Sequence, residues 1–187
     1  MKFVKIAATA LFFTAGINAA QAAEGPLFAY VEGRLGYETP TISEDKIYKL
    51  GNSASIGIEG GAGLKVSKIA NVGAFVNYDS ATSETCNSGY CLGSNGNLAY
   101  GLRADFRAAD KLGIYVKGGA DSFSLRAKVP GYAATQRLNG AMGAIGVTFD
   151  LSRHAYVGVE ANYADLGKFA GANFQRRHVA VTLGLRI

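Results

Sequence analysis

The chain has 187 residues, a formal net charge of +5, 25 glycines, three prolines and no tryptophan. This charge is too small to indicate nucleic-acid binding, and the length fits one domain. After residue 22 no stretch approaches the run of about 18 apolar residues that a transmembrane helix needs. The product is therefore either exported and soluble, or it crosses a membrane in another form.

Residues 1–22 have the features of a secretory signal peptide. A start with two lysines precedes an apolar stretch over 6–17, which is too short to span a bilayer. A small-x-small sequence ends at Ala22 and predicts cleavage there. Cleavage removes both lysines, so the mature chain 23–187 would carry +3. The alternative is an N-terminal helix that the mature protein retains.

Eight later segments alternate apolar and polar residues, which is the period of a β-strand. The segment 155–163, AYVGVEANY, is typical: its odd positions are apolar, and Glu160 stands on the opposite face. No helical period competes with this alternation in 23–187. The predicted strands are 27–38, 53–66, 71–79, 97–107, 112–123, 139–150, 155–165 and 177–187.

In each predicted strand one face carries no charge, while the opposite face carries ions of both signs. A slip of one residue would move these ions onto the apolar face. Against lipid, each Arg or Lys near the midplane would cost about 2–4 kcal/mol, so the register is strongly specified. The charges predicted to face the interior are Glu32, Arg34, Glu59, Lys65, Asp79, Arg103, Asp105, Arg107, Lys117, Asp121, Asp150, Glu160 and Arg186.

The connections alternate between short and long, as in outer-membrane barrels with short periplasmic turns and long external loops. The short connections are 67–70, 108–111 and 151–154; the long ones are 39–52, 80–96, 124–138 and 166–176. A soluble exported β-sandwich, the competing class, has no reason to segregate its loops in this way.

Aromatic residues on the apolar face form two groups, as the girdles of such barrels do. Those at the predicted external ends are Tyr37, Tyr78, Tyr100 and Tyr163; those at the periplasmic ends are Phe106 and Phe149. We therefore predict an all-β fold, an eight-stranded antiparallel up-and-down transmembrane β-barrel over 23–187, with both termini periplasmic. Eight strands enclose a space that side chains can fill, and Glu160 would pair there with Arg or Lys.

The two cysteines, Cys86 and Cys91, lie in the predicted external loop 80–96. Export to an oxidising compartment favours a disulfide between them over two free thiols. Metal binding is disfavoured because four residues separate the cysteines and no histidine lies nearby in the sequence.

These features together resemble the small outer-membrane β-barrel superfamily, which includes OmpA-like transmembrane domains and opacity-type surface proteins. The resemblance covers the mature chain and rests on the order of the strands and on three segments. These segments are FDLSRHAYVGVEANY, VGVEANYADLG and the terminal HVAVTLGLRI. The resemblance implies a place in the outer membrane of a Gram-negative cell. Members usually end in an aromatic residue, whereas this chain ends in Ile187, and we expect no peptidoglycan-binding domain after it.

Some eight-stranded barrels are lipid A deacylases, whose site resembles a Ser-His-acid arrangement with the His and Ser two residues apart on one strand. Neither His154 nor His178 is followed two residues later by a serine, since Tyr156 and Ala180 stand there. We therefore expect no enzyme, no cofactor and no metal. A narrow porin-like channel is the alternative function, although near-balanced interior charges fit ion pairs better than a selective pore.

The predicted external loops are the expected functional surface, because loops on a rigid scaffold commonly carry function. Their cations are Arg126, Lys128, Arg137, Lys168, Arg176 and Arg177. They would contact lipopolysaccharide phosphates or an anionic host or matrix surface, or else only be solvated beside the anionic leaflet. We predict a monomeric structural or surface-interaction protein whose partners are outer-membrane lipid and lipopolysaccharide, with no nucleic acid.

Overall fold

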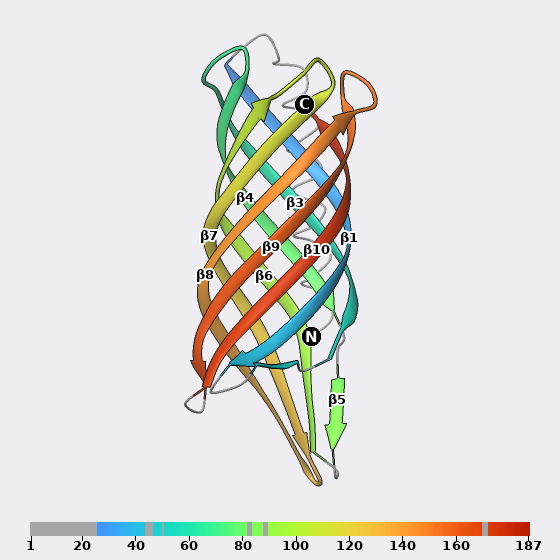
Figure 1. Cartoon of the computed structure of the whole chain (residues 1–187), viewed down its shortest axis with the longest axis vertical. Coiled ribbons are helices and arrows are strands. Elements are labelled where there is room, and N and C mark those ends of the chain that lie inside the picture. Colours follow the sequence, from blue (N-terminus) through green and yellow to red (C-terminus); the bar gives the residue numbers. More distant parts are fainter. Residues whose placement is uncertain (1–25, 44–46, 50, 82–83, 88–89, 170–171) are drawn as a thin grey trace, which may run out of the picture.

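Ten antiparallel strands form one closed sheet in the computed structural model, which describes residues 26–43, 47–49, 51–81, 84–87, 90–169 and 172–187 (Figure 1). The predicted signal peptide, residues 1–22, lies outside the described residues. The strands are β1 Leu27–Ser43, β2 Ile47–Lys49, β3 Ser53–Lys65, β4 Ala70–Ala81, β5 Glu84–Asn87, β6 Tyr90–Arg107, β7 Leu112–Val129, β8 Tyr132–Asp150, β9 Ala155–Phe169 and β10 Ala172–Arg186.

Eight long strands form the barrel wall in the order β1, β3, β4, β6, β7, β8, β9, β10, and β10 pairs with β1 to close it. At the closure Ala29 and Ile187 exchange backbone hydrogen bonds of 3.1 and 2.9 Å. The short strands β2 and β5 pair with the ends of β1 and β6, outside the eight-stranded wall. The predicted fold class, an eight-stranded antiparallel up-and-down barrel, is confirmed.

The three predicted short turns gather at one end of the barrel, which we call the turn end (top of Figure 1). Each turn has the same backbone hydrogen bonds, in which two successive amides donate to the carbonyl of the residue that opens the next strand. In the last turn, for example, Leu151 N and Ser152 N both donate to Ala155 O, at 2.9 and 3.1 Å. The three turns therefore have the same form.

At the opposite end, the hairpin end, strands run beyond their predicted limits, and β5 and the β7–β8 hairpin project furthest (bottom of Figure 1). The predicted loop over 124–138 was wrong, because β7 and β8 stay paired until Val129 faces Tyr132. Pro130 and Gly131 make the turn, with Gly131 at φ 80°, as the second central residue of a type II turn requires. Much of the predicted loop 80–96 likewise belongs to β5 and β6.

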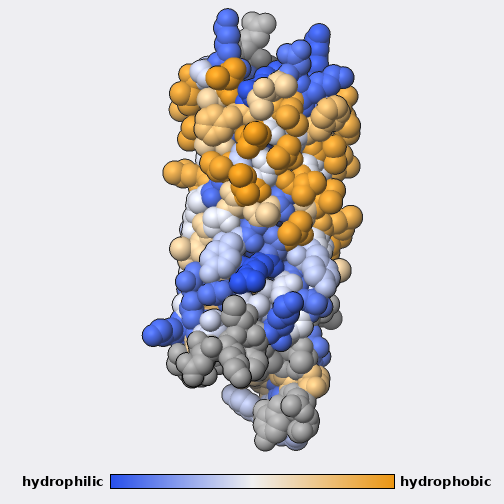
Figure 2. Space-filling view, viewed as in Figure 1, coloured by the Kyte–Doolittle hydropathy of each residue, from blue (hydrophilic) through white to orange (hydrophobic). Residues whose placement is uncertain are grey.

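The outer surface of the wall is apolar over most of its length and polar toward the hairpin end. This change explains why the apolar–polar alternation in the sequence stops before the strands end. Over most of the wall, apolar side chains point outward, as with Leu35 and Leu183, and they form the orange band in Figure 2. Toward the hairpin end the surface becomes hydrophilic, and apolar side chains such as Leu125 and Leu138 point inward. No helix among the described residues is long and apolar enough to cross a membrane.

Candidate functional site

The middle of the barrel interior holds a cluster of ion pairs around Glu160, whose side chain is 1% exposed. Arg34 Nη2 donates to Glu160 Oε1 at 2.7 Å, and Arg34 Nη1 donates to Glu59 Oε2 at 3.1 Å. The Lys117 ammonium donates to the carboxylates of both Glu59 and Glu160. Four strands, β1, β3, β7 and β9, are thereby joined across the lumen by charge-assisted hydrogen bonds.

Arg103 extends this cluster toward the turn end. Its Nη1 donates to Glu32 Oε1 at 2.6 Å, and its guanidinium lies 4.4 Å and 3.9 Å from the ring centroids of Tyr30 and Tyr115. The Tyr156 hydroxyl donates to the same Glu32 oxygen at 2.7 Å. The guanidinium is therefore enclosed by a carboxylate and aromatic faces, and its side chain is almost completely buried.

The space over several interior glycines is occupied by tyrosine rings. Each ring lies against the glycine directly opposite on the next strand, and the three pairs are Tyr30–Gly61, Tyr115–Gly146 and Tyr156–Gly184. A Cβ at position 146 would lie 2.2 Å from the Tyr115 ring. These glycines therefore make room for aromatic side chains rather than for a water path.

A second cluster, nearer the hairpin end, surrounds Arg176. The prediction that Arg176 is an external cation was wrong, because its side chain is 0% exposed. It donates to Glu38 at 2.9 Å, Asp79 at 3.3 Å and Asp121 at 3.5 Å. The reason is that β10 begins at Ala172, five residues before its predicted start, so position 176 faces inward. Glu38 was missed although it shares the inward parity of Glu32.

Beyond Arg176, at the hairpin end, apolar side chains fill the barrel. The Phe123 and Phe174 rings pack with centroids 5.5 Å apart. Buried neighbours in the same cluster are Leu125, Leu138, Met142, Ala164 and Leu166. The lumen is thus filled by two ionic layers and then by this apolar layer, as the predicted packing of an eight-stranded barrel requires.

Five of the charges predicted to face the interior lie at the mouth of the turn end. Lys65 and Arg107 are solvent-exposed, so their assignment to the interior was wrong; β3 and β6 end at these residues, where the wall no longer covers them. Asp105, Asp150 and Arg186 are half-buried, and Arg186 forms an ion pair with Asp150. The remaining predicted interior charges, including Asp79 and Asp121, are buried.

A serine, a histidine and an aspartate from three different strands meet inside the barrel, a grouping that the sequence did not reveal. Ser55 Oγ lies 2.8 Å from His178 Nε2, and His178 Nδ1 lies 4.0 Å from Asp79 Oδ2. All three are buried, and Asp79 is held by Arg34 and Arg176. A Cβ at Gly36 would lie 2.1 Å from His178 Nε2, so the wall covers the pair directly. His154, by contrast, is exposed in a turn.

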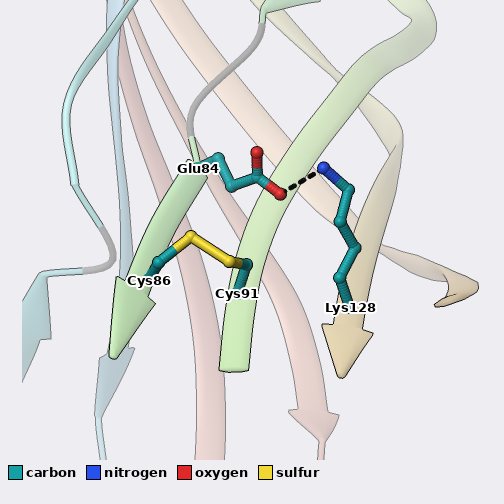
Figure 3. Close-up of a disulfide and its surroundings, with 4 residues drawn as sticks. All are labelled: Glu84, Cys86, Cys91 and Lys128. Atoms are coloured by element: carbon teal, nitrogen blue, oxygen red, sulfur yellow. Dashed lines mark ion pairs between the residues drawn. A yellow bond between two sulfur atoms is a disulfide. The ribbon is translucent and has the colours of Figure 1, made fainter. Parts of the chain in front are cut away.

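The hairpin end carries the disulfide. Cys86 and Cys91 face each other across β5 and β6, with an S–S distance of 2.02 Å (Figure 3). Beside them Glu84 and Lys128 form an ion pair of 2.5 Å that links β5 to β7 (Figure 3). Glu84 and the two cysteines lie close enough to suggest metal ligands, but sulfur atoms in a disulfide are not available to bind a metal.

Most of the other predicted external cations occupy strand ends rather than loops. Arg126 faces Thr135 and Arg137 faces Ser124, so these two arginines are diagonal neighbours on the outer face of the β7–β8 hairpin. Both are exposed, and Lys128 is half-buried beside Glu84. Lys168 is exposed at the end of β9, and Arg177 points outward from β10. Apart from Arg176, the predicted cations therefore stay on the outer surface of the hairpin end.

The model of the outer membrane protein beta-barrel domain family matches residues 6–186. No curated protein sequence matches the chain. Among solved structures, Ail, the attachment invasion locus protein of Yersinia pestis, in complex with the heparin analogue sucrose octasulfate is 14% identical. The match covers 85% of this chain and 99% of Ail, with a TM-score of 0.61.

Two further structures have the same fold. Neisserial surface protein A is 16% identical over 85% of this chain and 96% of its own, with a TM-score of 0.59. OprG of Pseudomonas aeruginosa is 10% identical over 87% and 96%, with a TM-score of 0.55. At these identities the likeness shows the fold alone.

Proposed function

Because the chain belongs to the outer-membrane β-barrel family and lies in the outer membrane, we propose that it is a surface-interaction protein that binds polyanions through its external hairpins. The hairpin end is then external and the turn end periplasmic, as short periplasmic turns and longer external connections require. The barrel holds the hairpins rigidly, and the chemistry lies on their outward faces.

The observation that carries this proposal is the excess of exposed cations beside the projecting hairpins. Outward-facing or exposed charges described at this end are Lys49, Arg126, Lys128, Arg137, Lys168 and Arg177 against Glu84 and Asp165. Cations gathered on one surface create a positive potential that attracts anionic polymers. Arg126 and Arg137 also stand close enough to bind neighbouring anionic groups of a single polymer.

The Ail structure supports the ligand class, because that barrel is in complex with a heparin analogue, a densely sulfated sugar. At 14% identity no residue correspondence is transferred. The independent support is the chemistry of guanidinium groups, which pair with sulfate as they do with carboxylate and phosphate.

A narrow channel is the competing function, and the filled interior argues against it. Any path along the axis would have to break the Arg34–Glu160 and Arg176–Glu38 pairs and then displace the Phe123–Phe174 layer. Each buried ion pair costs several kcal/mol to separate. An enzymatic role is also disfavoured, because Ser55 and His178 are buried behind the wall at Gly36.

Heparin binding by the intact barrel in detergent or vesicles tests the proposal. We expect binding that falls steeply with added salt. The Arg126→Gln/Arg137→Gln variant should bind about tenfold more weakly, because each exposed charge contact contributes up to about 1 kcal/mol and a factor of ten is about 1.4 kcal/mol. Arg107→Gln, an exposed cation at the periplasmic mouth, is the matched control and should bind as the wild type does. Equal binding of neutral dextran, or no loss in the double variant, would contradict the proposal.

We also propose that residues 1–22 are removed on export and that the barrel is monomeric. N-terminal sequencing of the protein extracted from outer membranes should begin at Ala23. Retention of Met1 would refute the first part, and a mass of twice the chain on light scattering in detergent would refute the second.

A further inference from the structure

A shallow hollow of about 530 Å³ lies on the outer face of the wall, where β8, β9, β10 and β1 run side by side. Its floor is made by Gly143 and Ala161, and its sides by larger residues such as Tyr37, Ile145 and Tyr163. These large residues are exposed on the outer face, and the hollow opens on their side of the wall. The buried Asn162 and His178, which face inward, also contribute to its lining. This depression therefore faces the lipid of the membrane.

The polarity of the hollow changes along the membrane normal. One row across the strands reads Tyr37, Val179, Ala161, Ile145, which is entirely apolar or aromatic. The next row toward the external side reads Thr39, Arg177, Tyr163, Gly143. A cation thus stands at the level of the external aromatic girdle, directly above an apolar depression.

Arg177 is available to a ligand. Its side chain is exposed and forms no ion pair with any residue that the structure describes. Asp165 lies diagonally across from it on β9, but its carboxylate oxygen accepts a hydrogen bond of 3.1 Å from Gly167 N. A guanidinium at the headgroup level is suited to bidentate binding of phosphate.

We propose that this hollow binds one lipid A molecule of the outer leaflet, with a phosphate on Arg177 and an acyl chain over Gly143 and Ala161. The two rows identify the bound molecule as a lipid. The apolar row faces hydrocarbon, and Arg177 lies where lipid phosphates lie. A soluble partner would leave the apolar row without a counterpart. This site lies on the barrel wall and shares only Arg177 with the cations counted for polyanion binding. The two proposals can fail separately, because the Arg126→Gln/Arg137→Gln variant leaves the hollow intact.

Native mass spectrometry of the purified barrel with added lipid tests the proposal. The probes are diphosphoryl lipid A, the same lipid after dephosphorylation, and phosphatidylglycerol. Arg177→Gln removes the cation, and Gly143→Leu fills the hollow. A Cβ at 143 meets nothing closer than Lys117 O at 3.9 Å, so the barrel accepts it. Gly33→Leu is the matched control, because a Cβ there also lies 3.9 Å from its nearest atom. Arg107→Gln, at the turn end, controls for the loss of another exposed cation.

We expect Arg177→Gln and Gly143→Leu each to weaken diphosphoryl lipid A binding about tenfold, with both controls unchanged. Dephosphorylated lipid A and phosphatidylglycerol should bind the wild type about tenfold more weakly. Wild-type binding by both test variants would overturn the proposal. An equal loss in Arg107→Gln would overturn it as well. Equal binding of phosphatidylglycerol would overturn the assignment to lipid A. Heat-modifiable migration on gels verifies that every variant is folded.

Discussion

Replacing Glu160 by glutamine should destabilise the barrel more than any single change to an exposed charge. The side chain keeps its shape, but its negative charge disappears from between Arg34 and Lys117. Both cations are almost completely buried, so water cannot replace the lost partner. The Tyr115 hydroxyl, 3.0 Å from Glu160 Oε2, also loses a charged acceptor.

The magnitude follows from what each cation retains. Removing one member of a buried ion pair costs about 3–5 kcal/mol when the partner is left alone. Here Glu59 still contacts both Arg34 and Lys117. We therefore expect the lower end of that range, about 3 kcal/mol. Adding Lys117→Met should recover part of this loss, because an apolar side chain removes the uncompensated charge.

The assay is urea unfolding of the barrel in lipid vesicles, followed by circular dichroism and by gel mobility without boiling. Glu84→Gln is the control, since the Glu84–Lys128 pair is about 40% exposed and should contribute at most about 1 kcal/mol. A Glu160→Gln barrel as stable as wild type, or no less stable than Glu84→Gln, would refute the account of the interior as a set of interdependent ion pairs.

Three other changes have defined outcomes. Gly146→Ala should lower the free energy of unfolding by about 1–3 kcal/mol, because its Cβ displaces the Tyr115 ring, whereas Gly143→Ala should be neutral. Equal effects of the two changes on urea unfolding would contradict the packing of tyrosine rings over glycines. Replacing Cys86 and Cys91 by serine should leave barrel folding unchanged but speed proteolysis of the β5–β6 hairpin, and free thiols in the non-reduced wild type would exclude the bond. A fluorophosphonate probe should not label Ser55 in the folded barrel, because the wall covers it, and labelling that Ser55→Ala abolishes would revive an enzymatic role.

Strand number and inward parity were predictable because lipid imposes one rule on the whole transmembrane part of the wall. Every outward position there must be apolar, so Glu32, Arg34 and Glu160 were assignable to the interior from alternation alone. The partners of each charge were not predictable, because they come from strands far apart in the sequence, such as β1 and β9 for Arg34–Glu160.

The hairpin end was harder to predict because its surroundings change. Beyond the membrane the wall meets water, so Leu125 and Leu138 turn inward and the alternation reverses phase. Reading the reversal as a loop placed Arg176 at the surface. Glu38 was missed for another reason, since it lies inside the predicted strand 27–38 and its parity already pointed inward. Pro130-Gly131 was the signal for a tight turn, and it would have placed the end of the β7–β8 hairpin.

Single-channel recording in planar bilayers tests most directly whether the interior is closed and the function therefore lies on the outside. With the wild-type barrel inserted, and an open porin as the positive control in the same bilayers, we predict a current indistinguishable from that of the bare membrane. Discrete, reproducible openings that scale with salt concentration would contradict the filled lumen and would move the function from the external surface to the pore.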